Sequence, residues 1–422
     1  MSRNVQTPSK ASAFPNEWQP VRLGSIGKTY GGLTGKSGKD FNTGSASYIT
    51  FMQVMGNSRL REPAKGTVNI DPGERQNHVQ KYDLLFNGSS ETPEEVALAA
   101  AVDFHPDSNT FLNSFCFGFR LLPDAPADSF YLAYLFRSSV GRNLVSSLAQ
   151  GATRYNIPKT QLLNQAIHLP PKAEQIAIRE RLTDAEELID SLERLISKKQ
   201  AIKQGMMQEL LSGKTRLPGF QESWVQTKIG KLASVVGGGT PSTKTPSYWN
   251  GDIPWFTPGE ISKNGSGLIK SSERSITSEG LQRSGAKLLP ANSILVTSRA
   301  SLGHCAVAEV PVATNQGFTS LVPKDSQSSW FLYYWMQHNR HELQTEAAGS
   351  TFLEINSAKV ESIPITIPSI REQEAIAEVL RDADNEINAL NRRLESVRSI
   401  KQGMMQELLT GRTRLPNKEA VE

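Results

Sequence analysis

An exact internal repeat constrains this chain more than any other feature of its sequence. The run IKQGMMQELL at residues 202–211 recurs unchanged at residues 400–409, an offset of 198 residues. Over the wider windows 170–218 and 368–416, 27 of 49 aligned positions are identical. This offset is far longer than the roughly 20–50 residues typical of solenoid repeats. The chain is therefore predicted to be two half-molecules, each a globular domain followed by the same distal element.

Both copies of the distal element have the pattern of a long helix with a coiled-coil seam. Apolar residues alternate four and three positions apart, which places them on one face of a helix. Prolines precede each copy, and a glycine followed by a proline marks its end. We expect the seam to pair the two helices or to bind a partner. Its residues are Ile178, Leu182, Ile189, Leu192, Ile196 and Met206 in the first copy and Ile376, Leu380, Ile387, Leu390, Leu394 and Met404 in the second.

The repeat divides the chain into two domains and two spacers. The domains are predicted at residues 1–169 and 219–367, and the helical spacers at 170–218 and 368–416, with a short tail at 417–422. Short β-type runs in both domains predict small mixed or antiparallel sheets. The expected fold class is α+β: two α/β domains separated by two long helices that form an antiparallel coiled coil around a pseudo-two-fold axis.

The two domains resemble each other only in a faint common order of motifs. Each opens with a tryptophan-led run, at Trp18 and Trp224, and then reaches a glycine pair at residues 31–32 or 237–238. Near its end, Gly151-Ala-Thr-Arg-Tyr-Asn-Ile157 stands where the second domain has Gly349-Ser-Thr-Phe-Leu-Glu-Ile355. Divergent domains on near-identical spacers suggest two different ligands, or two different pieces of one long ligand such as DNA.

Composition limits the possible classes of protein. The 46 Lys and Arg residues against 42 Asp and Glu give a net charge of only +4, so any DNA-binding face must come from local sorting of charge. The polar N-terminus and the short apolar runs predict a cytoplasmic protein without a signal peptide or membrane span. The only two cysteines, Cys116 and Cys305, are expected to be buried thiols.

The duplicated segment KQGMMQELL(S/T)G resembles the conserved region of type I restriction-modification specificity subunits. Gly237-Gly-Gly-Thr-Pro-Ser242, Ile253-Pro-Trp255 and Thr297-Ser-Arg-Ala-Ser-Leu-Gly303 resemble their variable regions. The resemblance covers almost the whole chain. It implies two target-recognition domains that read an asymmetric, interrupted site in double-stranded DNA. It also implies helical regions that dock two adenine methyltransferase subunits and, through them, two restriction (translocase) subunits.

The first domain departs from this pattern in two places. It has Phe86-Asn-Gly-Ser-Ser-Glu91 where the second has Val296-Thr-Ser-Arg-Ala-Ser301, and it has no Ile-Pro-Trp motif. In the second domain, we expect the Trp255 indole to be buried.

Motifs for catalysis are missing from the sequence. No Asp/Asn-Pro-Pro-aromatic adenine-methylation motif and no Glu-x-Lys nuclease constellation occurs. Only three residues separate Gly31 from Gly35, where a phosphate-binding loop needs four. His338 and His341 have no recognisable partners for a metal site. The chain is therefore expected to be non-catalytic and without a metal or cofactor, with S-adenosylmethionine, ATP and Mg²⁺ bound only by partner subunits.

Candidate DNA contacts are polar, basic or aromatic residues in loops next to these motifs. Arg, Asn, Gln and Lys can read base edges, whereas Ser and Thr often hold phosphates. The candidates are Lys36, Asn87, Ser89, Arg154 and Tyr155 in the first domain and Thr240, Ser242, Lys244, Arg299, Ser301 and Thr351 in the second.

One alternative function remains open at this point. The chain could be a coiled-coil adaptor with two ligand-binding domains and no role on DNA, which would need no methyltransferase partner. An adjacent reading frame with an adenine-methylation motif would separate the two hypotheses.

Overall fold

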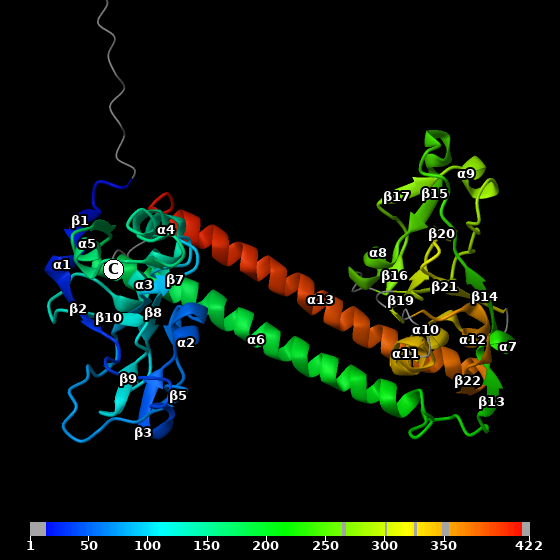
Figure 1. Cartoon of the computed structure of the whole chain (residues 1–422), viewed down its shortest axis with the longest axis horizontal. Helices are drawn as coiled ribbons and strands as arrows, with labels where there is room; N and C mark the ends of the chain where they lie inside the picture. Colours follow the sequence, from blue (N-terminus) through cyan, green and yellow to red (C-terminus); the bar gives the residue numbers. More distant parts are fainter. Residues whose placement is uncertain (1–13, 264–266, 300–301, 325–326, 348–353, 416–422) are drawn as a thin grey trace, which may run out of the picture. The chain divides into compact units, whose positions relative to one another are not determined.

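The computed structural model (Figure 1) describes residues 14–263, 267–299, 302–324, 327–347 and 354–415. The chain forms two compact units. Unit 1 comprises Met1–Asp190 and Glu395–Glu422, and unit 2 comprises Ser191–Leu394. Each unit therefore contains one globular domain and a part of both long helices. Among the described residues, no helix combines the length and the hydrophobicity needed to cross a bilayer.

The globular part of unit 1 is built on a five-stranded sheet with the strand order β2-β10-β6-β8-β4. β4 is parallel to β8, and the other neighbours are antiparallel. A three-stranded sheet has the order β5-β3-β9, and two-stranded pairs join β1 to β12 and β7 to β11. The strands are β1 Gln19–Arg22, β2 Gly27–Gly31, β3 Phe41–Ile49, β4 Arg59–Leu60, β5 Gly66–Val68, β6 Leu84–Asn87, β7 Ser89–Ser90, β8 Ala99–Val102, β9 Thr110–Leu112, β10 Cys116–Leu121, β11 Tyr155–Asn156 and β12 Ala166–Leu169.

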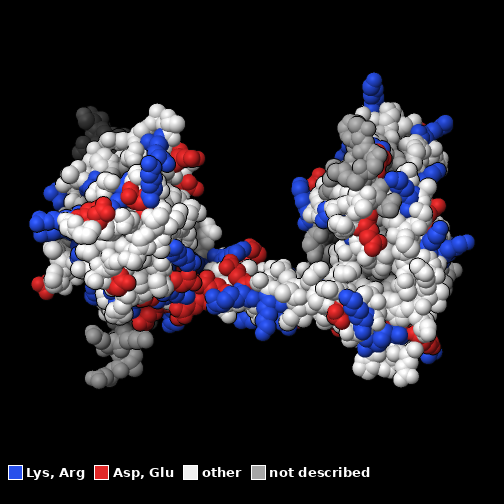
Figure 2. All heavy atoms as spheres, turned by 60° about the horizontal axis from the view of Figure 1, so that its bottom comes forward, with Lys and Arg blue, Asp and Glu red and all other residues white. Residues whose placement is uncertain are grey.

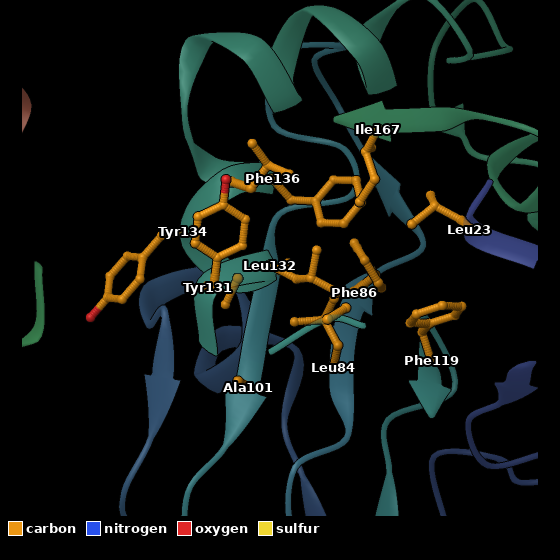
Figure 3. Packing of buried hydrophobic residues seen from close by; sticks show 14 of the residues in the cluster. Leu23, Leu84, Phe86, Ala101, Phe119, Tyr131, Leu132, Tyr134, Phe136 and Ile167 are labelled. Atoms are coloured by element: carbon orange, nitrogen blue, oxygen red, sulfur yellow. The ribbon is translucent and has the colours of Figure 1, made fainter. Parts of the chain in front are cut away.

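The core of unit 1 lies between the five-stranded sheet and α3 (Ser129–Arg137). Eight of the nine residues of α3, all except Arg137, are buried, as its almost wholly apolar sequence predicts. The small side chains of β8 contact α3 closely. Figure 3 shows aromatic and aliphatic side chains of the sheet and α3 converging, with the Tyr134 hydroxyl pointing out of the cluster. The remaining short helices are α1 Leu23–Ile26, α2 Phe51–Gly56, α4 Ser139–Ser146 and α5 Lys159–Leu163.

The globular part of unit 2 repeats this topology. Its five-stranded sheet has the order β14-β21-β18-β19-β16, its three-stranded sheet the order β17-β15-β20, and β13 pairs with β22. The strands are β13 Val225–Lys228, β14 Ala233–Gly237, β15 Trp249–Phe256, β16 Leu268–Ile269, β17 Arg274–Ile276, β18 Ile294–Val296, β19 Cys305–Ala308, β20 Ala313–Thr314, β21 Thr319–Pro323 and β22 Pro364–Ile367. The helices are α7 Ile229–Leu232, η1 Pro246–Tyr248, α8 Pro258–Lys263, α9 Ser278–Gln282, α10 Ser329–His338, α11 Arg340–Ala347 and α12 Ser357–Ser362. The two domains thus share one α/β fold.

The predicted spacers are the long helices α6 (Lys172–Leu210) and α13 (Ile370–Leu408). After each helix the chain turns at a glycine in the left-handed region, Gly213 with φ 72° and Gly411 with φ 73°. Most of the predicted seam residues are buried. The buried members are Ile178, Leu182, Leu192, Ile196, Ile376, Leu380, Ile387 and Leu394. Ile189, Leu390, Met206 and Met404 are half-buried.

Bidentate arginine pairs join the two helices in antiparallel fashion within each unit. In unit 1, Arg414 follows α13 and donates through Nε and Nη2 to both carboxylate oxygens of Glu174 at the start of α6, at 2.6 and 2.8 Å. In unit 2, Arg216 follows α6 and makes the same pair with Glu372 at the start of α13, at 2.5 and 2.6 Å. The arginine of the TRLP motif in each repeat copy therefore bonds to the glutamate of the Glu-Gln motif in the other copy.

Lys401 of α13 and its repeat equivalent Lys203 of α6 also have carboxylate partners. In unit 1, Lys401 Nζ lies 2.6 Å from Glu186 Oε1. Glu186 accepts two further bonds, from the hydroxyls of Ser58 at 2.6 Å and Tyr134 at 2.8 Å. Burial acts to raise the pKa of Glu186, but Lys401 and the two hydroxyls outweigh burial and hold this pKa below its usual value.

Unit 2 contains the equivalent arrangement. Lys203 Nζ lies 2.6 Å from Asp384 Oδ1, and the Tyr334 hydroxyl donates to Asp384 Oδ2 at 2.7 Å. Tyr134 and Tyr334 belong to α3 and α10, so each triad joins a globular domain to both long helices.

Glycine pairs end the first strand of each five-stranded sheet. A Cβ atom on Gly32 would lie 2.0 Å from the carbonyl oxygen of Asn113, and one on Gly238 would lie 2.0 Å from that of Asn315. A Cβ on Gly237 would meet no atom within 4 Å. Only the second glycine of each pair is therefore required by close backbone approach.

Replacing Lys401 by Met is expected to lower the free energy of unfolding of unit 1 by about 2–3 kcal/mol, because it leaves a largely buried carboxylate without its cation. The side chains of Lys401 and Glu186 retain 24% and 15% exposure, which keeps the loss below that of a fully buried pair. Denaturant unfolding of the full chain measures the change. Lys198→Met, on the exposed face of α6, is the control and should change stability little.

The same interaction should make the stability of unit 1 depend on pH. Because folding depresses the pKa of Glu186, its contribution is present above the ordinary carboxylate range and is lost as the pH falls through the folded-state pKa. The Lys401→Met chain should lose less stability over that acidic range than the parent. Equal acid sensitivity in the two chains would contradict the assignment.

Gly238→Ala is expected to destabilise unit 2 by about 1–3 kcal/mol, because the new methyl group overlaps a backbone carbonyl that cannot move freely. Gly237→Ala, one residue earlier, should stay within about 0.5 kcal/mol of the parent. Thermal or denaturant unfolding of both variants compares the two sites. Similar losses of stability at both positions would show that close approach to the Asn315 carbonyl is not the reason for glycine at position 238.

Candidate nucleic-acid interface

Three strand ends meet at one edge of the five-stranded sheet in unit 1. β2 ends at Gly31, β6 ends at Asn87, and β10 begins at Cys116. The register pairs Gly31 with Phe117 and Asn87 with Cys116, so these ends lie side by side. We call the segments that leave this edge, residues 31–40, 87–98 and 113–115, together with 151–157, the loop edge of unit 1.

Four of the predicted DNA-contact residues come together at this loop edge. Ser89 and Ser90 form β7, which pairs with Tyr155 and Asn156 of β11. Arg154 is exposed and directly precedes this pair. The antiparallel pairing therefore brings Asn87 and Ser89 into one region with Arg154 and Tyr155, which lie more than sixty positions later in the sequence.

The predicted contact Ser89 is only 6% exposed, and two further predicted contacts form hydrogen bonds or ion pairs inside the protein. Asn87 is fully buried, donates through Nδ2 to the Glu95 carbonyl at 2.8 Å, and accepts at Oδ1 from the Leu98 amide at 2.6 Å. The Lys36 side chain is 4% exposed and forms an ion pair with Glu74. Both side chains hold loops in place, and their contact with DNA stays a prediction.

The loop edge of unit 2 has the same construction. β14 ends at Gly237, which pairs with Thr319 of β21, and Thr297 forms a bridge with Phe318 directly after β18. Arg299 forms a bridge with Glu354, in the place where unit 1 pairs Ser89 with Asn156. The Arg299 Nη2 lies 2.7 Å from Glu354 Oε1, and their side chains are 48% and 40% exposed. Arg299 is thus oriented by a carboxylate and open to solvent.

Indole hydrogen bonds join the segment 249–255, which contains the Ile-Pro-Trp motif, to the glycine-rich motif at residues 237–242. Trp255 donates from Nε1 to the Gly239 carbonyl at 3.0 Å, and Trp249 donates to the Ser242 carbonyl at 3.1 Å. Trp255 is 3% exposed, as expected, and packs edge-on against Trp249 at 5.1 Å. The indoles therefore support the loop that follows β14.

The predicted contacts on this supported loop are exposed. Ser242 and Lys244 are exposed, and Thr240 is exposed with its hydroxyl donating to Gln316 Oε1. Ser301 and Thr351 lie outside the described residues. These assignments place the candidates on a surface, and contact with DNA stays a prediction for each of them.

Sequence reasoning missed three side chains at or near these loops. Phe115 is 53% exposed, and the Arg154 guanidinium lies 5.1 Å from its ring centroid. Phe115 lies within the apolar run around β10, and this sequence pattern is typical of a buried core residue. Arg274 on β17 is exposed and stacks 3.6 Å from the Trp249 ring centroid. The Lys159 Nζ lies 5.7 Å from the ring centroid of Phe117. The only sequence signal for Lys159 was its position three residues after the segment 155–156.

The charge distribution gives no single basic face in the view of Figure 2, where Lys and Arg are interspersed with Asp and Glu. Cys116 and Cys305 are buried free thiols, and burial raises the pKa of each to about 12. Such thiols stay protonated at neutral pH and are poor nucleophiles. Within the described part of the chain, no three His, Cys, Asp or Glu side chains gather closely enough to hold a metal ion.

Known proteins share both the sequence and the fold. The family model "Type I restriction modification DNA specificity domain" matches twice, at residues 15–204 and 221–398. The MjaX specificity subunit of Methanocaldococcus jannaschii, a putative type I restriction enzyme subunit, is 25% identical over 426 residues and covers 95% of both chains.

Two further relatives match more strongly over a shorter span. The MjaIX specificity subunit of the same organism is 37% identical over 181 residues, and the Escherichia coli EcoR124I/EcoR124II specificity subunit is 32% identical over 183. These alignments span 42% of this chain in both cases, and 42% and 45% of the relatives.

A solved structure supports the fold. The type I restriction-modification S subunit from M. genitalium aligns with a TM-score of 0.61 at 15% identity, over 95% of this chain and 97% of that chain. Since the family model matches most of the chain in two copies, the chain belongs to the type I restriction-modification DNA specificity family.

Proposed function

We propose that this chain reads a bipartite, asymmetric DNA target for a type I restriction-modification complex, with one half-site for each globular domain. The observation that carries this proposal is the pair of loop edges, which share one framework but present different side chains. At equivalent positions, Ser89 of unit 1 is only 6% exposed, whereas the Arg299 side chain of unit 2 is 48% exposed. Arg suits guanine O6 and N7, and unit 1 has no arginine at the equivalent position, so unlike half-sites are expected.

The proposed partners are two adenine methyltransferase subunits, through which two restriction subunits join. The seam residues are buried or half-buried within the chain, so we expect a partner to use other faces of the helices. α6 exposes Leu188, Leu195 and Ile202 at seven-residue spacing, and α13 exposes Ile400, the repeat equivalent of Ile202. Exposed apolar residues at heptad spacing fit a helix of another protein.

The chemistry in this proposal belongs to the partners. S-adenosylmethionine, ATP and Mg²⁺ would be bound by the methyltransferase and restriction subunits, and this chain would supply the sequence recognition. The chain alone is therefore expected neither to methylate nor to cleave DNA, while co-expression with its methyltransferase restores adenine methylation. S-adenosylmethionine-dependent methylation by the chain alone at the rate of the complex would overturn the assignment.

Exchange of residues 219–367 for the same domain of a relative should change one half of the recognised site and leave the other half intact. The reason is that each loop edge is built within its own unit. Methylome sequencing of cells that express the hybrid with the methyltransferase reads out both half-sites at once. A hybrid that changes both halves, or that recognises a continuous site, contradicts one domain per half-site.

Arg299→Ala should weaken recognition of the half-site read by unit 2 by about 1–3 kcal/mol if the guanidinium makes a bidentate base contact. If Arg299 instead touches phosphate, the loss is nearly uniform across sequences and the salt dependence falls. Binding to matched and substituted duplexes measures both effects. Arg398→Ala is the control, because Arg398 on α13 is also 48% exposed and paired with a carboxylate. Unchanged binding by a folded Arg299→Ala chain would remove this residue from the interface.

A further inference from the structure

The loop between β6 and β8 is held by an unusual set of hydrogen bonds to its own backbone. Four successive carbonyl oxygens, those of Glu94, Glu95, Val96 and Ala97, all accept from side chains. The Arg142 guanidinium of α4 donates from Nε to Glu94 at 3.0 Å, from Nη1 to Ala97 at 3.1 Å, and from Nη2 to Val96. Asn87 Nδ2 donates to Glu95 at 2.8 Å. The side chains of Arg142 and Asn87 thus bind every backbone carbonyl of residues 94–97.

Asn87 also closes the base of this loop. Its backbone amide donates to the Leu98 carbonyl at 3.3 Å, and its backbone carbonyl accepts from the Ala97 amide at 3.0 Å. Its Oδ1 accepts from the Leu98 amide at 2.6 Å. Ala97, at the point of closure, has a φ of 55°, in the left-handed region that costs a residue with a Cβ about 1–2 kcal/mol. The loop is held in a backbone conformation that it would not adopt freely.

Arg142 makes this closure at a cost in desolvation. Nη1 also donates to the Phe136 carbonyl at 3.4 Å, so the guanidinium faces backbone carbonyls. Burial lowers the pKa of Arg142 to about 10, which still leaves it charged at neutral pH. Burial of a cation is unfavourable unless its hydrogen bonds have good geometry. The carbonyls that bond Arg142 are therefore held in one arrangement.

Unit 2 contains an independent copy of the closure with different residues. Thr297 takes the place of Asn87: its amide donates to the His304 carbonyl at 2.8 Å, its carbonyl accepts from Gly303 at 2.9 Å, and its Oγ1 accepts from the His304 amide at 3.0 Å. Gly303, at the point of closure, has a φ of 79°. Arg340 of α11 donates from Nε to the Leu302 carbonyl at 2.8 Å. The three bonds of Asn87 to residues 97 and 98 therefore recur at Thr297, and Arg340 makes one bond to a loop carbonyl where Arg142 makes three.

What the closure encloses differs between the two units. Residues 88–96 separate Asn87 from Ala97 in unit 1, and the shorter stretch 298–302 separates Thr297 from Gly303 in unit 2. The second residue of each enclosed segment pairs with another strand: Ser89, which is buried, pairs with Asn156 of β11, and Arg299, which is half-exposed, pairs with Glu354. A constant closure thus surrounds a segment of variable length and chemistry.

We propose that Asn87 with Arg142, and Thr297 with Arg340, form a loop clamp that positions the DNA-specificity segment of each domain. This inference rests on the proposed function and assigns Asn87 a positioning role in place of a base-reading one. The clamp holds the exposed residues Glu91 and Thr92 in unit 1 and Arg299 in unit 2 in one arrangement, so the loop loses little entropy on binding. The same clamp is expected to hold segments of other lengths and sequences.

The test uses the full chain with its methyltransferase and compares Arg142→Ala with Arg340→Ala. Methylation rates are measured on DNA with each base of both half-sites substituted in turn. Arg142→Ala should reduce discrimination between correct and substituted bases on the order of tenfold in the half-site of unit 1 and leave the other half-site unchanged. Arg340→Ala should show the reverse pattern, so each variant is the other's control.

A second variant guards against simple loss of folding. Asn87→Thr installs the residue that unit 2 uses, which keeps an acceptor for the Leu98 amide and removes the bond to Glu95. It should produce a smaller loss of discrimination in the same half-site, with amide hydrogen exchange faster in residues 88–98 only. Thr297→Asn is its counterpart in unit 2.

The outcomes separate the clamp from the function on which it rests. Loss of rate without loss of discrimination, or equal loss at both half-sites, would overturn the clamp as a positioning device. Failure of the unsubstituted complex to recognise any bipartite sequence would instead overturn the proposed function. In that case hydrogen exchange alone decides whether the clamp orders its loop, and unchanged exchange in Arg142→Ala would reject it.

Discussion

The structure of both units depends on buried carboxylates at the junctions of the two long helices. Glu174 and Glu372 are at most 2% exposed, and each is satisfied by a two-pronged arginine that comes from beyond the end of the other helix. A carboxylate without its partner at such a position would be costly, so the pairing selects one antiparallel register. Lys401 and Lys203 add a second pairing of the same kind. Apolar burial along the stripe supplies attraction but would tolerate other registers.

These junctions also connect the helices to the globular cores. Ile178 and Leu182 of α6, Leu408 of α13 and Leu409 directly after it belong to the core of unit 1, around α3. Met207 and Leu210 of α6 and Ile376 and Leu380 of α13 belong to the core of unit 2. Each domain therefore packs on the start of the helix that follows it and on the end of the other helix. A domain and its helix ends form one unit for this reason.

The loop edges show how one framework can carry two specificities. Close backbone approach requires Gly32 and Gly238, and the clamps close loops whose contents differ. Rigid strands and buried polar contacts support these loops, while several of their side chains are exposed. Exposed residues such as Arg154 and Lys244 can therefore change with little effect on folding, whereas the clamp residues cannot.

The sequence by itself determined the two-fold organisation, the long helices and their seam, because an offset repeat and a heptad pattern are local, periodic signals. It also predicted the family, through motifs that occur in duplicate. Only the tertiary structure showed that Asn87 and Lys36 are engaged inside the protein and that Phe115 is exposed. Strand pairing and carbonyl contacts decide these facts, and they join residues such as Asn87 and Arg142 whose separation in the chain leaves no periodic trace. The clamp could not be predicted for the same reason: its acceptors are backbone atoms, which every sequence has.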